Sequence, residues 1–243
     1  MTVNDPTGHA EALLAEHAGR TRDLNRLIVH DMRSALQVVQ GYLGLALRDA
    51  DLADKTRAWL ERAGHGADTL TALASTLSDV ARLESGERPF ALDETAVRAL
   101  LDEAVESVRA AAPRHTITWT PPEGLDATVR LERSALARAV GYLLEHATKF
   151  SPAGSEVTVS LAVAEGVVRL AVTDAGAPVA PDDRARLFET LEQAALRRER
   201  KRYSSGLGLV FCRLTAEAHG GALRVESDGV AGATLTLELP TVG

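Results

Sequence analysis

The sequence has few of the residues that mark several common classes of protein. It has one cysteine, Cys212, in 243 residues, which excludes an internal disulfide framework and fits a reducing compartment. Aromatic residues make up 4% and the formal net charge is -7, whereas nucleic-acid binding needs a basic surface. No apolar run approaches the roughly 20 residues that cross a bilayer, and the first residues do not resemble a secretion signal. We therefore expect a cytoplasmic protein with no membrane segment and no nucleic-acid partner.

Two helices are predicted in the N-terminal third, at residues 8–50 and 55–83. The first segment is dense in Ala, Leu, Arg and Glu and contains no proline. The second ends before the cluster SGERP at 85–89, because glycine and proline stop helices. Residues 1–85 are therefore expected to form a helical hairpin domain.

The pattern changes after Pro89, where helical and alternating segments follow one another. Helices are predicted at 97–112, 131–149 and 207–219, and strands at 115–120, 156–164, 166–174, 222–228 and 233–240. Between them, residues 178–205 are polar and strongly charged. Helices that alternate with a mostly antiparallel sheet predict an α+β two-layer sandwich over residues 90–243.

The first helix carries two adjacent apolar seams at heptad spacing. One consists of Leu24, Ile28, Asp31, Ala35, Val38, Tyr42 and Leu45, and the other of Val29, Met32, Leu36, Val39, Leu43 and Ala46. A helix with two seams is covered from two directions, as in a four-helix bundle. Because one hairpin supplies only two helices, we expect a homodimer whose two hairpins form a dimeric four-helix bundle.

His30 lies nearly opposite the middle of the combined apolar arc, so its side chain is expected to face solvent. Its predicted surface neighbours are polar or small, namely Arg33, Ser34, Gln37, Gly41 and Gly44. Small residues there would leave room for a docking partner. Most exposed histidines on helices have no function, so a functional interpretation depends on the sequence around His30.

The segment HDMRSAL at 30–36 resembles the H-box of two-component histidine kinases. The resemblance implies that His30 accepts a phosphoryl group. It also implies that Asp31 draws a proton from the imidazole, so that the other ring nitrogen can attack. Ser34 stands where the family usually has Thr or Asn, at a position connected with dephosphorylating the partner regulator. Ala35 stands where the family often has proline, and this replacement removes a kink from the helix.

Residues 90–240 resemble the ATP-binding (GHKL or Bergerat) domain shared by histidine kinases, Hsp90-type chaperones and type II topoisomerases. In SSGLGLVFCRL at 204–214, Gly206 and Gly208 precede a helix, where backbone and helix N-terminus can receive phosphate. VTDAGAP at 172–178 keeps Asp174 and Gly176, and the family's aspartate here accepts a hydrogen bond from the adenine amino group. Phe188 matches the phenylalanine of the family's lid.

The N-box departs from the family pattern of two asparagines four residues apart. YLLEHATKFSP at 142–152 has Tyr142 and His146 at those positions and retains Lys149. The second asparagine is the family's Mg²⁺ ligand, and imidazole is a poor substitute because Mg²⁺ prefers oxygen. His146 is therefore a weak candidate for a metal ligand. ATP and Mg²⁺ are the implied cofactors, with their binding weakened or lost.

Two interpretations of the altered N-box stay open. In one, the protein still autophosphorylates, with an altered demand for metal. In the other, it is a pseudokinase or histidine phosphotransferase, and His30 receives phosphate from another kinase or receiver. The basic run at 196–203 is either a solvated loop or a contact for phosphates or an acidic partner.

We expect a cytoplasmic two-component histidine kinase that exchanges a phosphoryl group with the aspartate of a response regulator receiver domain. Its input would come from an upstream kinase or sensor protein, or from a signal that this core reads itself. A non-catalytic scaffold is an alternative from another class. A chaperone-like ATPase is a further alternative, against which the H-box argues.

Overall fold

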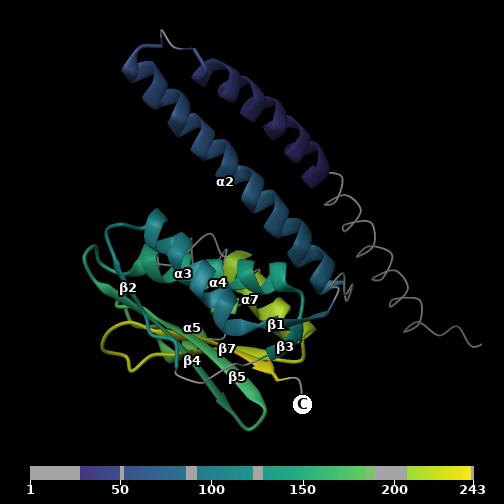
Figure 1. The fold of residues 1–243 in the computed structure, drawn as a ribbon, viewed down its shortest axis with the longest axis vertical. Helices are drawn as coiled ribbons and strands as arrows, with labels where there is room; N and C mark the ends of the chain where they lie inside the picture. Colours follow the sequence, from purple (N-terminus) through teal and green to yellow (C-terminus); the bar gives the residue numbers. More distant parts are fainter. Residues whose placement is uncertain are drawn as a thin grey trace, which may run out of the picture. The chain divides into compact units, whose positions relative to one another are not determined.

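The computed structural model describes residues 28–49, 52–85, 92–122, 128–184, 186–188 and 207–241. It divides into two compact units, one ending at Arg82 and the other beginning at Leu83. The described part of the first unit is helical, and the second unit combines helices with β-sheet (Figure 1).

A helical hairpin forms the first unit (Figure 1). Residues 28–47 are helical, and α2 follows at Asp54–Glu84, in agreement with the prediction. Residues 8–27 of the predicted first helix lie outside the described residues. Arg57 donates hydrogen bonds to the carbonyl oxygens of Leu47 (2.9 Å) and Asp49 (2.8 Å). These bonds satisfy carbonyls at the end of the first helix, which otherwise lack partners.

The side of the first helix that carries Arg33 and Gln40 faces α2. Arg33 donates to Oγ of Ser75 over 3.3 Å, and Gln40 donates to Oδ1 of Asp68 over 2.6 Å. The prediction that Arg33 lies on the solvent side beside His30 is therefore wrong. Arg33 follows the buried Val29 by about one helical turn, so the two residues lie on the same face.

A second apolar face of this helix stays exposed in the single chain. Its large exposed residues are Ile28, Met32, Val38, Val39, Tyr42 and Leu45, and α2 adds Trp59 and Leu70. Met32 and Val39 were predicted in one seam with Val29, but α2 does not cover them. An exposed apolar strip of this length is typical of a surface that binds another protein.

A five-stranded sheet forms one layer of the second unit, in the order β2-β4-β5-β7-β6. The strands are β2 (Thr116–Trp119), β4 (Glu156–Ala164), β5 (Val167–Thr173), β6 (Ala222–Glu226) and β7 (Thr234–Pro240). β2 runs parallel to β4, and the other neighbours are antiparallel. Glu165 and Gly166 have φ of 53° and 74°, as in the type I′ turns that join adjacent strands.

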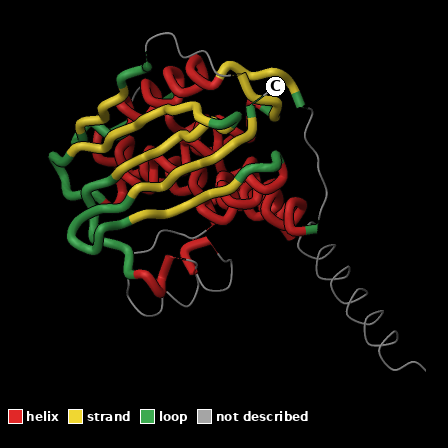
Figure 2. The backbone as a smooth tube through the Cα atoms, turned by 90° about the horizontal axis from the view of Figure 1, so that it is seen from below, coloured by secondary structure: helices red, strands yellow, loops and turns green. Residues whose placement is uncertain are grey.

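Three helices form the other layer and cover one face of this sheet (Figures 1 and 2). They are α3 (Val97–Ala111), α4 (Arg133–Phe150) and α7 (Leu207–Ala218). Alternate residues of the strands, such as Val168, Leu170 and Val172 in β5, are buried. Fully burying a side chain of this kind stabilises the fold by about 1.5–3 kcal/mol. The predicted α+β two-layer architecture is confirmed.

A small antiparallel sheet of β1 (Asp93–Ala96) and β3 (Thr128–Leu131) was not predicted. Each strand has only four residues, too few for a clear alternating pattern. Because β3 ends at Leu131, α4 begins at Arg133 and not at residue 131. The polar segment after Pro178 contains the short helix α5 (Pro181–Arg184) and the 3₁₀ turn η1 (Arg186–Phe188).

Candidate functional site

His30 projects from the exposed side of the first helix, as its heptad position predicts. The side chains of His30 and Asp31 are 76% and 70% exposed, and Nδ1 of His30 lies 3.2 Å from Oδ1 of Asp31. Ser34 donates from its hydroxyl to the carbonyl oxygen of His30 over 3.1 Å. The structure therefore brings the three predicted residues together on one surface.

The contact with Asp31 determines how the imidazole is presented. An ionised carboxylate can only accept, so the hydrogen bond requires the proton on Nδ1 of His30. In the neutral imidazole, the lone pair is then on Nε2. This is the arrangement of a histidine nucleophile oriented by an adjacent carboxylate.

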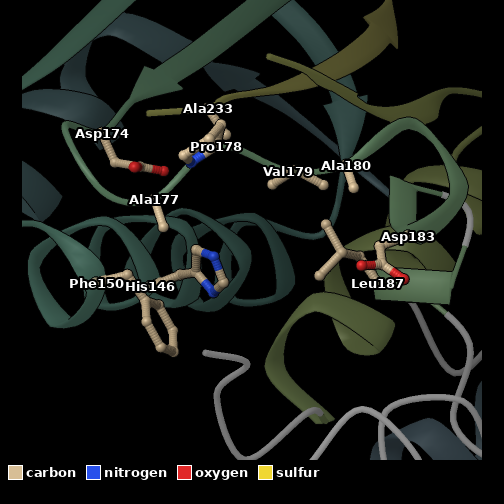
Figure 3. Close-up of a pocket in the computed structure, with 10 residues that line it drawn as sticks. All are labelled: His146, Phe150, Asp174, Ala177, Pro178, Val179, Ala180, Asp183, Leu187 and Ala233. Atoms are coloured by element: carbon tan, nitrogen blue, oxygen red, sulfur yellow. The ribbon is translucent and has the colours of Figure 1, made fainter. Parts of the chain in front are cut away.

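A cavity of about 250 Å³ lies in the second unit, between α4 and the segment that follows β5 (Figure 3). Its lining residues are His146, Phe150, Asp174, Ala177, Pro178, Val179, Ala180, Asp183, Leu187 and Ala233. Most of these are apolar, with few polar groups among them. A pocket of this composition suits a largely apolar ligand that is oriented by a few hydrogen bonds.

Asp174 is one of two buried carboxylates that line this cavity, and the residue is 7% exposed. Its Oδ1 accepts a hydrogen bond from the backbone N–H of Gly176 over 2.7 Å. Burial raises the pKa of Asp174, and hydrogen bonds from Gly176 and Ala233 oppose the rise. These hydrogen bonds hold the carboxylate in place, and its remaining lone pairs can accept from a ligand that donates.

Gly176 allows the backbone to approach the end of α4. A Cβ atom built there would lie 2.9 Å from the carbonyl oxygen of Phe150 and 2.8 Å from Oδ1 of Asp174. No larger residue fits without moving the backbone. Ser151 fixes the same turn by accepting a hydrogen bond from the N–H of Ala175 over 3.1 Å. The glycine is therefore required by packing around Asp174.

His146 projects from α4 into the cavity, and its ring packs against Phe150 with centroids 4.7 Å apart (Figure 3). Its Nδ1 is buried and has no hydrogen-bond partner among the described residues. Burial, with a smaller contribution from the charge of Lys149, lowers the pKa of His146 to about 4. The imidazole is neutral at pH 7 and offers a nitrogen lone pair. Lys149 itself is exposed one turn further along α4.

Tyr142 lies one turn before His146 and covers the start of α7. Its ring would be 3.2 Å from a Cβ atom at Gly208, and it meets Phe211 edge-on with centroids 5.6 Å apart. The guanidinium of Arg138 stacks on the same Phe211 ring at 4.5 Å. Gly208 thus permits close packing of α7 against Tyr142. Gly206 and the basic run at 196–203 lie outside the described residues.

The segment after β5 contributes Phe188, which the sequence singled out, and Asp183 and Leu187, which it did not. Phe188 is buried, as is Leu187 beside it, and Arg213 donates to the carbonyl oxygen of Phe188 over 3.2 Å. Asp183, only 4% exposed, lines the cavity and pairs with Arg186 at 3.0 Å. An aspartate in a strongly charged segment looks solvated in the sequence, so no signal there marks Asp183.

Among the described residues, no group of three or more His, Cys, Asp or Glu side chains is placed to hold a metal ion. Within the same ranges, no helix is both long and apolar enough to span a bilayer. Cys212 is fully buried and donates to the carbonyl oxygen of Ala139 over 3.3 Å. It is a structural thiol.

Two family models match the chain. One is described as the His Kinase A (phospho-acceptor) domain and matches residues 20–86. The other is described as the histidine kinase-, DNA gyrase B- and HSP90-like ATPase and matches residues 131–243. The first match contains His30, and the second contains the residues that line the cavity.

The chain is also similar to individual histidine kinases. The chain is 29% identical over 229 residues to the sensor-like histidine kinase SenX3 of Mycolicibacterium smegmatis, covering 93% of this chain and 60% of SenX3. The solved structure of full-length ShkA in complex with AMPPNP matches with a TM-score of 0.73 and 28% identity, over 90% of this chain and 46% of ShkA. The mycobacterial sensor histidine kinase MprB matches with 30% identity and a TM-score of 0.53, over 62% of this chain and 98% of the solved MprB chain.

Proposed function

The chain belongs to the two-component histidine kinase family, and on that premise we propose that it is a protein-histidine kinase phosphorylated on His30. ATP is the proposed phosphoryl donor, and the aspartate of a response regulator receiver domain is the proposed acceptor. The contact between Nδ1 of His30 and Asp31 on an exposed helix face carries the proposal. The chain spans 60% of the length of SenX3.

In the proposed first step, Nε2 of His30 attacks the γ-phosphorus of ATP. An N–P bond forms while the bond between the γ-phosphorus and its bridging oxygen breaks, and ADP leaves with the electron pair. The ring gains positive charge as the bond forms, and Asp31 stabilises that charge by accepting the Nδ1 proton. Exposure of both side chains gives donor and acceptor access to the same nitrogen.

The cavity beside Asp174 is the proposed site for the adenine ring. The apolar lining would pack on the faces of the ring, and the carboxylate of Asp174 would accept a hydrogen bond from the amino group. Phe188 is buried and anchors the segment that borders the cavity. Gly206, Gly208 and Lys149 are the proposed neighbours of the phosphates. The ShkA structure holds AMPPNP, an analogue of ATP, which supports nucleotide binding by this fold.

Mg²⁺ does not fit the side chains that line this cavity. The ion requires oxygen ligands in near-octahedral geometry, but α4 presents the imidazole of His146. Asp174 and Asp183 are the carboxylates of the lining, and each has an oxygen engaged by another group. No chemical step is therefore assigned to a protein-bound Mg²⁺.

The exposed apolar face of the hairpin supports a homodimer. Tyr42, whose side chain is 71% exposed, lies on this face with Met32 and Val39. Burying such a strip against a second copy would complete a four-helix bundle. The polar face that carries His30 would stay outside the dimer.

We place the docking site of the regulator beside His30. Gly41 and Gly44 follow His30 by about three and four helical turns, on the same side of the helix. A Cβ atom added to either glycine would meet no atom within 4 Å, so a partner can approach the helix backbone there. A receiver domain and this chain would then meet in the cytoplasm, the compartment we propose for both.

A relay without ATP is the second candidate, and the altered α4 surface favours it. Tyr142 occupies the space beside the start of α7, and His146 replaces an oxygen ligand. In that case His30 would receive its phosphoryl group from another kinase or from a phosphorylated receiver. The chemistry at His30 would be the same.

Labelled ATP separates the two candidates. Purified protein would be incubated with γ-labelled ATP and either Mg²⁺ or Mn²⁺, beside a His30→Gln variant. We expect label on the wild type and none on the variant. The relay would be favoured over the kinase if the wild type stays unlabelled with both ions but takes label from a phosphorylated donor kinase or receiver.

A further inference from the structure

We propose that Ser227 is a positioning residue of the cavity beside Asp174, and that it keeps this cavity in a shape that nucleotide can bind. The inference rests on the proposed function, because it requires that the cavity binds ATP. Ser227 follows β6 directly and is half-buried in the turn that leads to β7. It is not one of the residues that line the cavity, so it acts through the segment that it contacts.

The hydroxyl of Ser227 joins this turn to the segment after β5. It donates to the carbonyl oxygen of Gly232 over 2.7 Å and accepts from the backbone N–H of Val179 over 3.2 Å. A serine hydroxyl has one proton and two lone pairs, so it can make both hydrogen bonds at once. An alanine at this position can make neither.

The backbone of Ser227 holds the same segment at a second point, in the short helix α5. Nη2 of Arg184 donates to the carbonyl oxygen of Ser227 over 2.7 Å. Ser227 and Arg184 also line a hollow of about 440 Å³, whose other lining residues are polar or small. Because no large apolar side chain lines this hollow, hydrogen bonds contribute more to the contact than packing does.

The segment that Ser227 holds is one wall of the cavity (Figure 3). Val179, Ala180 and Asp183 all line the cavity. Val179 connects the two features directly, because its N–H bonds to Ser227 while its side chain is buried and lines the cavity. A shift of the backbone at Val179 therefore moves a side chain that a bound ring would contact.

The beginning of the segment is attached to the sheet by bonds that do not involve the side chain of residue 227. The N–H of Asp174 donates to the carbonyl oxygen of Ala233 over 2.9 Å, and the N–H of Gly232 donates to that of Gly176 over 2.7 Å. Both are backbone bonds, so a substitution at position 227 leaves their donors and acceptors in place. Loss of the hydroxyl should therefore loosen the segment from Val179 onward and leave Asp174 where it is.

The size of the effect follows from how a partly formed cavity binds. Losing one hydrogen bond changes an equilibrium constant by roughly two- to tenfold, and Ser227→Ala loses two. The apparent affinity for a ligand falls in proportion to the fraction of molecules in the binding-competent shape. We therefore expect Ser227→Ala to bind nucleotide about tenfold more weakly than the wild type, although none of the lining residues has changed.

Calorimetric titration of the full chain with AMPPNP and Mg²⁺ measures this change. Ser227→Thr retains a hydroxyl and should bind nearly as tightly as the wild type. Ser160→Ala removes the same group from an exposed position of β4 and should not change the affinity. Arg184→Met removes the bond from α5 to Ser227 and should weaken binding as Ser227→Ala does, which keeps the test valid if Ser227→Ala does not fold.

Hydrogen exchange measured by mass spectrometry tests whether the effect is local. Without nucleotide, the peptide that covers residues 177–184 should exchange faster in Ser227→Ala than in the wild type, and peptides from β4 and β5 should be unchanged. Saturating AMPPNP should restore slow exchange in residues 177–184, because the ligand selects the formed cavity. Faster exchange throughout the sheet would show a general loss of stability and would overturn the positioning role.

Failure of this inference is distinguishable from failure of the proposed function. If the wild type binds AMPPNP and both Ser227→Ala and Arg184→Met bind it equally tightly, the positioning role is overturned and ATP binding is unaffected. If the wild type does not bind AMPPNP, the nucleotide part of the proposed function fails, and the role of Ser227 fails with it.

Discussion

Nδ1 of His30 lies 3.2 Å from Oδ1 of Asp31, and both side chains are largely exposed. Exposure weakens such a contact as a source of stability, because water screens the charge and competes for the hydrogen bond. The pair is therefore better explained by chemistry than by folding. In the proposed mechanism, Asp31 accepts the Nδ1 proton and Nε2 is the nitrogen that reacts.

Asp31→Asn should slow phosphorylation of His30 without unfolding the hairpin. The amide cannot take the Nδ1 proton, and loss of a general base typically costs about 10²–10⁴-fold in rate. The initial rate of labelling, with whichever phosphoryl donor is active, measures the effect. Asp68→Asn, on the face of α2 that meets the first helix, would serve as a charge-matched control with a near-normal rate. Equal rates for Asp31→Asn and the wild type would remove Asp31 from the mechanism.

Asp174→Asn should weaken nucleotide binding and stabilise the free protein at neutral pH. Loss of a hydrogen bond to a charged acceptor corresponds to about 10–100-fold in affinity. Burial raises the pKa of Asp174, so the native state binds a proton more readily than the unfolded state. Stability from this group is present below its ordinary pKa and is lost as the pH rises through the raised value. The asparagine variant should therefore have a higher Tm at pH 7.5, with the difference shrinking toward pH 4.

Differential scanning fluorimetry and calorimetric titration measure the two effects. Glu145→Gln, on the exposed side of α4, provides a control that should change neither. A less stable Asp174→Asn protein at pH 7.5 would contradict the assigned cost of burying this carboxylate.

Gly208→Ala should destabilise the protein only while Tyr142 is present. The new methyl group would lie 3.2 Å from the ring of Tyr142, and overpacking of this kind costs about 1–3 kcal/mol. In a Tyr142→Ala background the same change should be neutral or stabilising. Gly141→Ala, which meets no atom within 4 Å in α4, should stabilise by about 0.5–1 kcal/mol. Urea unfolding of the wild type, Gly208→Ala, Tyr142→Ala and the double variant gives the coupling energy between positions 208 and 142. A coupling energy near zero would contradict the contact between Gly208 and Tyr142.

Tyr42→Glu should weaken the proposed dimer. A charge in the middle of the apolar face would be buried without a partner when two hairpins associate. Sedimentation velocity should show dissociation at concentrations where the wild type is dimeric. Gln37→Glu introduces the same charge on the side that carries His30 and should leave the dimer unchanged. A Tyr42→Glu protein as dimeric as the wild type would place the interface elsewhere.

Much of the fold could be predicted because it depends on regular patterns in the sequence. The heptad spacing around His30 correctly predicts its exposure, and the alternation in residues 156–173 predicts β4 and β5. The small sheet of β1 and β3 was missed because four-residue strands carry almost no periodic signal. Arg33 was misplaced because its charge suggested solvent, whereas a hydrogen bond to Ser75 holds it against α2.

The cavity could be predicted only in part. The sequence motifs single out Asp174, Gly176 and His146, and in the structure Asp174 and His146 line one cavity while Gly176 donates to Asp174. Asp183 and Leu187 could not be found from the sequence, because their burial arises from packing of a segment that is charged overall. That Nδ1 of His146 has no hydrogen-bond partner among the described residues is likewise a property of the packed structure.

The central claim is that His30 carries the phosphoryl group. Phosphorylated protein, prepared with ATP or with a phosphorylated donor, would be digested at neutral to basic pH and the modified peptide identified by tandem mass spectrometry. The account predicts an acid-labile, base-stable phosphate on His30, bonded to Nε2 as ³¹P NMR of the intact protein would show. An acid-stable phosphate, or a phosphate on any other residue with His30 unmodified, would contradict it.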